Sequence, residues 1–432
     1  MLNKRSFALF AAISLAGSMW FYVQYILIAH QKAEAAARNI PRGNLSDLYP
    51  RWLGARELLL RHRDPYSPEL TREIQAGYYG RPLDPSRPND PEDRQAFAYP
   101  VYVVFLLAPT ITLRFPVVQV GFRWFLIALV LLSVVLWLRI LRWKLSPAAL
   151  AAACILTLGS FQVLQGLKLQ QLSLFVSGLI AACLLSLVNG HLVAAGILLA
   201  LVTIKPQLVA LLIVWLFFWS LGRWKERRNL VWSFLASMGV LFAASFYILP
   251  GWMQEFWRAA HAYRNYNAGA LSILEVFLTP FWGRLLSILI VFVLTIVCWR
   301  NRRVTSDSPQ FAWVTSLVLA ITILTGPKTS PYNQVLLLPA VFLIFKAFPA
   351  LWETNLRTRL TLLIFMLIFL WPWLAALSLT TASLFAPIST IQRSWVLPLY
   401  ANLILPILVV ALLVLGFPQF LRAIPASLGE KS

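Results

Sequence analysis

The chain has 432 residues, of which 59% are hydrophobic and 12% charged, and its mean hydropathy is +0.73. These values exclude an ordinary soluble domain. The 37 Lys and Arg residues exceed the 16 Asp and Glu by 21, but they cluster between apolar runs, which indicates a topology signal rather than a nucleic-acid-binding face. Apolar runs of about 20 residues recur along the chain, so we expect an all-α polytopic membrane protein.

The first apolar run, residues 7–28, follows Lys4 and Arg5. A signal-peptide core has about 7–15 apolar residues, so this longer run is expected to be a retained anchor. Basic clusters at 4–5, 223–228, 300–303 and 357–359 mark the cytoplasmic side. With eleven further crossings, the sequence predicts about twelve membrane helices and two cytoplasmic termini: 99–113, 117–138, 147–164, 170–188, 191–220, 230–249, 282–299, 311–326, 331–347, 360–380 and 396–416.

The middle of this topology has an alternative. The run 99–113 would give only about 22 Å of helix, which is short for a crossing. If it does cross, Arg139, Arg142 and Lys144 lie outside, against the positive-inside tendency. The alternative keeps these three charges inside and folds 191–220 into a hairpin at Lys205-Pro206. Twelve single crossings is the arrangement that we predict.

We expect residues 30–97 to form an extracytoplasmic loop module within a single transmembrane domain, 1–432. This segment holds ten of the sixteen acidic residues. Apolar positions at helical spacing over 48–60 predict an amphipathic helix along the membrane surface, with Ser46 or Asp47 as its cap. The Pro, Asp and Asn residues of 82–91 indicate an irregular loop.

Carboxylates are scarce outside this loop, and only Glu275 approaches an apolar run. Cation-coupled transporters use acidic residues within the membrane, so this scarcity argues against secondary transport. Three cysteines, Cys154, Cys183 and Cys298, have no short spacing, so neither a disulfide framework nor a zinc site is indicated. We expect any catalytic carboxylate to lie in the outer loop.

Short motifs follow one another along residues 1–340. They are Asp47 after the first helix, His62-Arg-Asp-Pro-Tyr66, Tyr99-Pro-Val101, Gln165-Gly166 with Gln170-Gln171, and Ile204-Lys-Pro206. In this order the chain resembles glycosyltransferase family 87, whose members have the GT-C fold and use polyprenyl-phosphate sugars. Several positions depart from the family pattern: Val101 replaces a second Pro, Arg63 replaces a Gly, and Ser330-Pro-Tyr-Asn-Gln334 lacks the following His.

The resemblance implies that Asp47 is the general base. Sugar transfer to an alcohol needs a base near the hydroxyl and positive charge near the departing phosphate. Without the family pattern, Asp47 would be interpreted as a helix N-cap. Asp64 is expected to be structural, because Asp-Pro-Tyr is typical of a turn.

Candidate substrate-binding residues are those that could contact the phosphate or the sugar. Lys205 stands out, because a Lys inside an apolar helix is costly, although it could instead reach the interface. The tract 257–266 mixes cations with aromatic residues and could be either a binding surface or an interfacial belt. The Gln residues of 162–171 could hold sugar hydroxyls or only bond between helices. The predicted substrate-binding residues are Lys205, Arg51, Gln165, Gln170, His261, Arg264 and Lys328, with Lys168 as a further candidate.

The predicted protein is a hexosyltransferase of the plasma (inner) membrane. It would move a sugar, with mannose as the first candidate, from a polyprenyl-phosphate donor to a lipid or glycan acceptor on the extracytoplasmic side, with inversion. No cofactor or metal is expected, since no Gly-rich nucleotide loop is present and a cation-lined pocket could stabilise the phosphate. The alternatives are a transporter or flippase of lipid-linked saccharides and a polymerase or ligase of O-antigen type.

Overall fold

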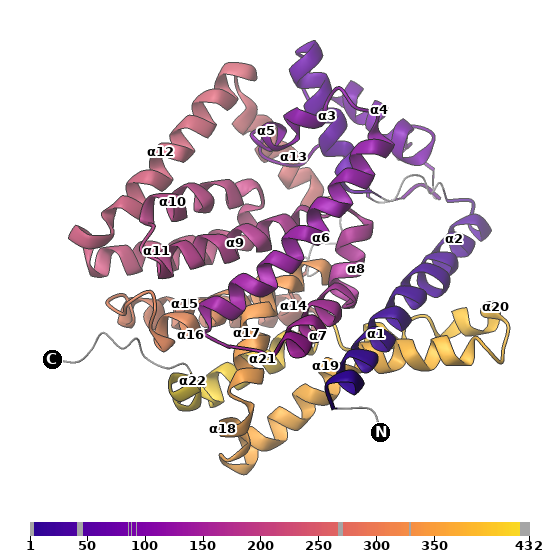
Figure 1. The fold of residues 1–432 in the computed structure, drawn as a ribbon. Helices are drawn as coiled ribbons and strands as arrows, with labels where there is room; N and C mark the ends of the chain where they lie inside the picture. Colours follow the sequence, from indigo (N-terminus) through magenta and orange to yellow (C-terminus); the bar gives the residue numbers. More distant parts are fainter. Residues whose placement is uncertain are drawn as a thin grey trace.

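The structure is a computed structural model that describes residues 4–40, 46–84, 86–87, 89–91, 93–266, 271–327 and 330–423. The described residues form helices and connecting loops, with no strand among them, and Figure 1 shows these helices packed around one another. The α-helices are α1 Lys4–Phe21, α2 Ile28–Ala37, α3 Leu48–Arg61, α4 Pro68–Tyr79, α5 Val103–Leu107, α6 Phe115–Ile140, α7 Pro147–Leu158, α8 Phe161–Lys168, α9 Leu172–Val188, α10 Leu192–Leu201, α11 Pro206–Gly222, α12 Trp224–Ile248, α13 Trp252–Tyr266, α14 Ile273–Phe277, α15 Pro280–Arg300, α16 Pro309–Thr325, α17 Leu338–Lys346, α18 Phe348–Trp352, α19 Leu356–Ala382, α20 Ile388–Ile391, α21 Leu405–Leu415 and α22 Phe417–Ala423. Short η segments join some of them, including η1 Tyr22–Leu27, η2 Ala108–Thr110, η3 Val202–Ile204 and η5 Pro331–Leu337.

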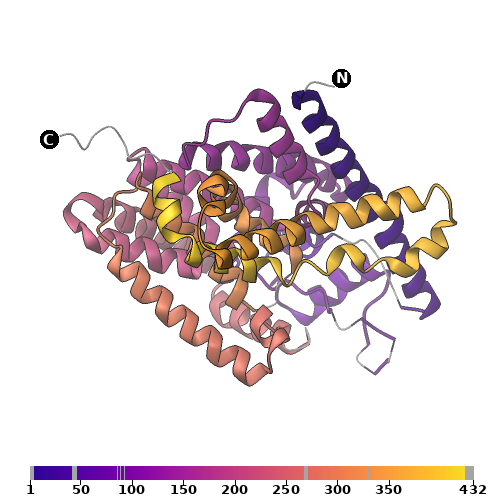
Figure 2. The same cartoon turned by 90° about the horizontal axis from the view of Figure 1, so that it is seen from below.

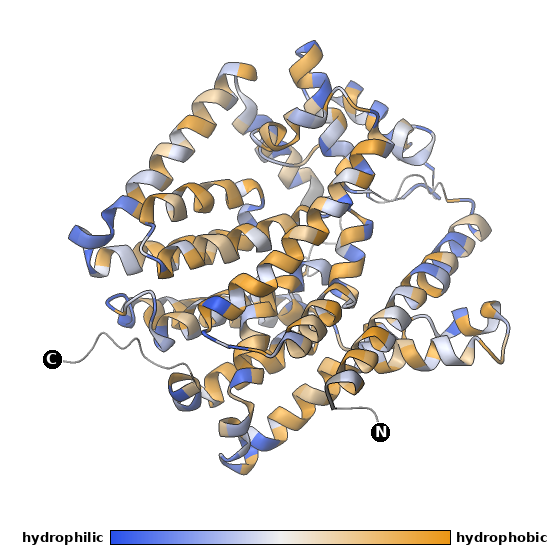
Figure 3. Cartoon of the chain, in the orientation of Figure 1, coloured by the Kyte–Doolittle hydropathy of each residue, from blue (hydrophilic) through white to orange (hydrophobic). Residues whose placement is uncertain are grey.

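Five described helices are long and apolar enough to cross a membrane: 6–37, α6, α12, α15 and α19. Two bent pairs, α7 with α8 and α21 with α22, pass the same test together, and several shorter helices are also apolar. Figure 3 shows apolar residues through the bundle and hydrophilic ones mainly at helix ends and in the loop around α3 and α4. The chain is therefore an integral membrane protein, as predicted, while the count of twelve crossings stays a prediction.

The crossing predicted at 99–113 is wrong. This stretch forms only α5 and η2, which are eight residues long in sum, five plus three. Its side chains Val103, Val104 and Leu107 are buried against the rest of the protein. Pro100 precedes the helix and Pro109 lies within η2, and each lacks the N–H that a longer helix would need.

The single crossing predicted at 191–220 is also wrong, because the chain reverses at Lys205. Thr203 near the end of α10 reaches Met238 of α12, whereas Gly196 lies against residues 230–234, so α10 and α12 run in the same direction. Phe217 near the end of α11 packs on Phe234, so α11 runs the other way. Pro206 begins α11 and cannot continue α10, which explains the hairpin.

The loop after α6 lies at the same end of the bundle as the loop after α15. Arg142 donates to the Asp307 carboxylate at 3.0 Å, and the Lys346 ammonium donates to the Leu141 carbonyl at 2.7 Å. In Figure 2 the loop before α7 and the start of α1 lie on one side of the molecule, and α13 lies on the opposite side. The prediction that placed Arg142 on the opposite side from the other basic loops is therefore wrong. The alternative topology, which places Arg142 on their side and folds 191–220 into a hairpin, matches the structure.

Between the first helix and α5, the chain packs onto the bundle. The predicted helix over 48–60 is present as α3, and Leu48, Trp52 and Leu58 are buried in the main core. The Asp47 N–H donates to the Leu169 carbonyl at 2.9 Å, and the Tyr102 hydroxyl donates to the Thr203 carbonyl at 3.0 Å. These bonds fix the start of α3 and the start of α5 to the bundle.

Gly196 provides a test of the packing between α10 and α12. A Cβ at this position would lie 2.5 Å from the Leu230 carbonyl oxygen and 2.9 Å from the Phe234 nitrogen, and neither backbone atom can move aside. We expect Gly196→Ala to lower the unfolding free energy by about 1–3 kcal/mol, as overpacking does. Gly239→Ala on α12 is the control, because open space surrounds that position. Thermal unfolding in detergent measures both, and equal melting temperatures would contradict the described helix contact.

Candidate active site

A cavity of about 800 Å³ lies between the start of α3, the hairpin at Lys205, α13, α15 and the segment that begins η5. Its polar and charged lining comes from parts of the sequence that are up to 286 residues apart, from position 47 to position 333. The polar residues that line it are Asp47, Arg51, Tyr99, Gln171, Lys205, Gln207, Glu275, Arg284, Ser287, Thr325, Ser330, Tyr332 and Asn333. It brings together three predicted site residues, Asp47, Arg51 and Lys205.

Asp47 precedes α3, but its side chain makes no cap bond to that helix. Its carboxylate instead accepts a hydrogen bond from the Gln171 side-chain amide. Ser46 does not cap the helix either, because its hydroxyl donates to the Gln170 side-chain oxygen at 2.5 Å. The expected cap at Ser46 or Asp47 is therefore absent, and the Asp47 carboxylate is left facing the cavity.

Lys205 is buried at the break between η3 and α11. Its ammonium donates to the Gln171 side-chain oxygen at 2.8 Å and to the Ser173 hydroxyl at 2.7 Å. The ammonium also lies 5.4 Å from the centre of the Tyr332 ring and 5.9 Å from that of Tyr99, within the range of a cation–π interaction. Lys205 thus stays inside the protein and does not reach out to the membrane interface.

Gln171 connects the Asp47 carboxylate to the Lys205 ammonium. Its amide nitrogen donates to Asp47 and its amide oxygen accepts from Lys205. Burial raises the pKa of Asp47 above its usual value, and the positive charges of Arg51 and Lys205 act in the opposite direction. A carboxyl with a raised pKa is a stronger proton acceptor, which suits a general base.

Arg51 places a second cation beside Asp47. It lies one helical turn after Asp47 on α3, and its guanidinium donates to the Asp47 backbone carbonyl at 2.5 Å. The guanidinium also stacks 4.6 Å from the centre of the Tyr99 ring. Tyr99 is held in turn by the Tyr66 hydroxyl, which donates to its carbonyl at 2.6 Å. The Asp64 carboxylate accepts from the Tyr66 N–H at 2.9 Å, so the predicted Asp-Pro-Tyr turn is confirmed.

The rim of the cavity is formed by exposed residues of α13 and α15. Arg284 bonds to the Glu275 carboxylate with an Nε–Oε1 distance of 3.3 Å, and its side chain is 62% exposed. Trp257 is 73% exposed and Ile288 is 62% exposed, although both line the cavity. The mouth of the cavity therefore lies between α13 and α15, and Asp47 and Lys205 lie at its closed end.

Three of the predicted substrate-binding residues do not line this cavity, and their role in binding stays a prediction. Gln170 is buried and donates to the carbonyls of Leu167 and Lys168, so it holds the turn between α8 and α9. Gln165 does not reach the cavity, and His261 is on the exposed face of α13. The Arg264 side chain and the whole of Lys328 lie outside the described residues.

Sequence reasoning did not select several residues that line the cavity. Gln171 was one of four neighbouring Gln residues, and nothing in the sequence distinguished it from Gln170. Arg284 was not selected and Glu275 was noted only as an acid near an apolar run, because their pairing across nine residues depends on the turn between α14 and α15. The Tyr99-Pro motif and the 330–334 segment did contain a signal, since both line the cavity.

Comparisons with known proteins show the family of the chain. The family model described as glycosyltransferase family 87 matches residues 97–327, which is more than half of the chain. No curated protein and no solved structure matches the chain. The matched residues include Tyr99, Lys205 and Arg284, whereas Asp47 and Arg51 precede them.

Proposed function

Since the chain belongs to glycosyltransferase family 87 and is a membrane glycosyltransferase, we propose that it transfers a hexose from a polyprenyl-phosphate donor to a lipid or glycan acceptor. Mannose is the first candidate for the sugar. The observation that carries this proposal is the connection of a carboxylate and an ammonium through Gln171 in one cavity. The proposed reaction requires both of these charges. No cofactor is proposed, and the lipid-linked sugar phosphate is the donor substrate.

In the proposed reaction, the acceptor hydroxyl oxygen attacks the anomeric carbon of the donor sugar. The bond from that carbon to the phosphate oxygen breaks, the hydroxyl proton passes to the Asp47 carboxylate, and the polyprenyl phosphate leaves. A single displacement of this kind inverts the anomeric configuration. Asp47 would act as the general base, and such groups contribute about 10²–10⁴-fold to the rate.

Lys205 and Arg51 are the proposed partners of the departing phosphate. Both are cations that line the cavity at the end where Asp47 lies. Charge that develops on the leaving phosphate is stabilised most strongly by fixed cations in a site that excludes water. The surrounding rings of Tyr99 and Tyr332 hold the Lys205 ammonium in place and offer apolar faces to a sugar.

The proposed location is the plasma membrane, with the cavity on the extracytoplasmic side. Basic clusters flank the opposite ends of the helices, as the positive-inside tendency requires. We propose twelve crossings: the five long helices, the two bent pairs, and the shorter runs α9, α10 with η3, α11, α16 and η5 with α17. This arrangement keeps the loop of Arg142 in the cytoplasm, and the GT-C arrangement of the family would be its fold class.

A transfer assay tests the proposal. Purified protein is incubated with radiolabelled polyprenyl-phosphate mannose, glucose or galactose and a lipid-extract acceptor pool, and the products are separated by chromatography. We expect label to appear in a new product from one donor, with inverted configuration at the anomeric carbon. Movement of labelled donor across vesicle membranes without product would support the transporter or flippase instead. Product from none of the three donors would contradict the proposed donor class.

The pH dependence of transfer follows from the raised pKa of Asp47. A general base must be unprotonated, so kcat/KM falls as the pH drops through its pKa. We expect this acid limb to lie above about pH 4, the usual range of an Asp carboxyl. The phosphodiester of the donor does not titrate there, so the limb reports on the enzyme. Activity that stays constant down to pH 4 would contradict Asp47 as the base.

Arg284 at the rim is expected to assist the capture of the donor. Because its side chain is mostly exposed, the loss of one charged contact costs at most about 1 kcal/mol, or roughly fivefold. We expect Arg284→Gln to raise the KM for the donor by up to about fivefold and to leave kcat unchanged. Arg258→Gln is the matched control, since the exposure of Arg258 is similar and it pairs with Glu255 on α13. An unchanged KM in Arg284→Gln would contradict a role in donor binding.

A further inference from the structure

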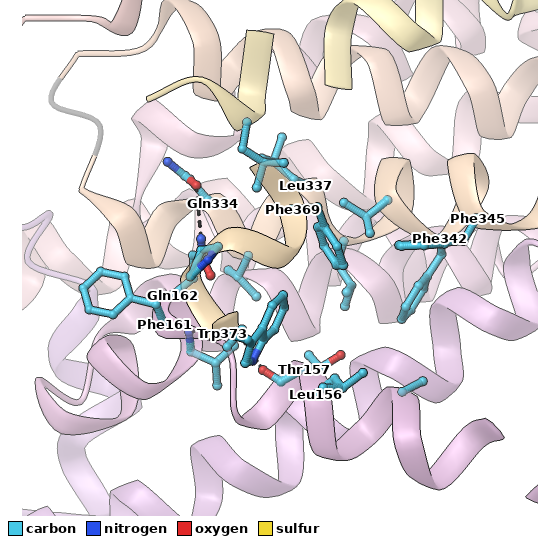
Figure 4. Close-up of a pocket in the computed structure, with 18 of the residues that line it drawn as sticks. Leu156, Thr157, Phe161, Gln162, Gln334, Leu337, Phe342, Phe345, Phe369 and Trp373 are labelled. Carbon is cyan, nitrogen blue, oxygen red and sulfur yellow. Dashed lines mark hydrogen bonds between the residues drawn. The ribbon is translucent and has the colours of Figure 1, made fainter. Parts of the chain in front are cut away.

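A second cavity, of about 430 Å³, lies on the other side of η5 from the candidate active site. Tyr332 and Asn333 of η5 line the polar cavity, and the next two residues, Gln334 and Val335, line the second one. Figure 4 shows this second cavity, with Gln162 and Gln334 bonded to each other and the rings of Phe369 and Trp373 beside them. One short helical segment therefore separates the two cavities.

The second cavity is suited to an uncharged hydrocarbon chain. None of the described residues that line it carries a charge, and the walls are mainly aliphatic and aromatic. Among its polar groups, the Gln162 amide donates to the side-chain oxygens of Gln334 and Asn402. The Gln334 amide donates to the Asn402 backbone carbonyl. The Trp373 indole N–H is already used, because it donates to the Gly159 carbonyl at 2.9 Å. The volume is within the range of about 300–1,000 Å³ that is typical of ligand pockets.

Small side chains on α7 keep this cavity open. Ala149, Ala152, Ala153 and Leu156 all line it, and their spacing places them on one face of the helix. Larger side chains at the three Ala positions would occupy the space. Since α7 and α8 together form a candidate membrane span, the cavity lies within the apolar part of the bundle.

We propose that this cavity binds the hydrocarbon chain of the acceptor lipid. The inference rests on the proposed function, which requires two substrates to meet at Asp47. The donor phosphate is assigned to the polar cavity, because Arg51, Lys205 and Arg284 lie there. That cavity opens beside Ile288 on the exposed apolar face of α15, where the long donor chain can lie along the membrane. The cavity behind η5 is then left for the acceptor, whose neutral chain it matches.

Photolabelling tests this assignment without requiring turnover. The probe is a hexadecyl mannoside with a diazirine at the end of its chain, used with the full-length protein in detergent, and the labelled peptides are identified by mass spectrometry. We expect labels on α7 and α19, which excess unlabelled hexadecyl mannoside suppresses. In Ala153→Phe the labelling of these helices should fall at least tenfold. Ala236→Phe on the exposed face of α12 is the control and should label as the wild type does.

A farnesyl phosphate with the same diazirine distinguishes the donor chain from the acceptor chain. We expect this second probe to label α15 in preference to α7 and α19. Labelling of α7 and α19 by farnesyl phosphate, with none by the mannoside, would overturn the acceptor assignment. Labelling of neither helix by either probe, or an unaffected Ala153→Phe, would overturn the site itself. If the wild-type protein transfers no sugar but the mannoside still labels α7 and α19, only the proposed function would be contradicted.

Discussion

Replacing Asp47 with Asn is expected to lower kcat/KM for sugar transfer by about 10²–10⁴-fold, the usual contribution of a general base. Asn has nearly the same shape as Asp but cannot take up the proton of the acceptor hydroxyl. Its side-chain oxygen can still accept the hydrogen bond from Gln171, so the cavity should keep its geometry. Transfer of label by the purified variant measures the loss, and thermal unfolding checks that the protein is folded.

Asp64→Asn is the matched control for this experiment. Asp64 is in the same loop and its carboxylate accepts from the Tyr66 N–H, a bond that Asn can also make. We therefore expect this variant to retain transfer. Full activity in Asp47→Asn would exclude Asp47 as the base, even though the enzyme class would stand.

Replacing Lys205 with Met is expected to lower kcat/KM by about 10²–10³-fold, similar to the loss of one donor that stabilises charge in a transition state. Met keeps the length of the side chain and suits a buried position. If Lys205 stabilises the leaving phosphate, the loss will be mainly in kcat, and a donor with a better leaving group should recover part of it. The removal of this positive charge should also raise the pKa of Asp47 further and move the acid limb of the rate to higher pH.

Lys346→Met is the comparison for Lys205→Met. Lys346 is also at the end of an apolar helix, but its ammonium donates to backbone carbonyls at the other end of the bundle. Its replacement can affect stability but should leave the acid limb and the leaving-group dependence unchanged. Equal losses in both variants, with the same leaving-group dependence, would indicate a structural role for Lys205.

The helical class and the membrane location could be predicted from hydropathy alone, because the bilayer requires long apolar helices. The path of the chain between residues 99 and 220 could not be predicted from hydropathy. The apolar run 191–220 is interrupted near its middle only by Thr203, Lys205-Pro206 and Gln207, and the contacts of α10 and α11 with α12 show that it folds back there. The two prolines within 99–113 were visible in the sequence, but the packing of α5 against α3 was not.

The candidate site, like the fold, could be predicted only in part. Lys205 could be found because a lysine in an apolar run is rare, and Asp47 could be selected because of the family resemblance. Their connection could not be found, since Gln171 is 124 residues from Asp47 and 34 from Lys205. The sequence could not show that Gln171, and not Gln165 or Gln170, lines this cavity, because the neighbouring Gln residues have the same chemistry.

The side-chain amide of Gln171 determines how the two charged groups of this cavity interact. Opposite charges that meet in a buried site form a direct ion pair, and each then loses much of its reactivity toward other molecules. The neutral carboxamide of Gln171 bonds to both Asp47 and Lys205 and so holds the two charged groups apart. In the proposed reaction, the carboxylate would thereby stay basic toward an incoming hydroxyl, and the ammonium would stay available to an anionic donor.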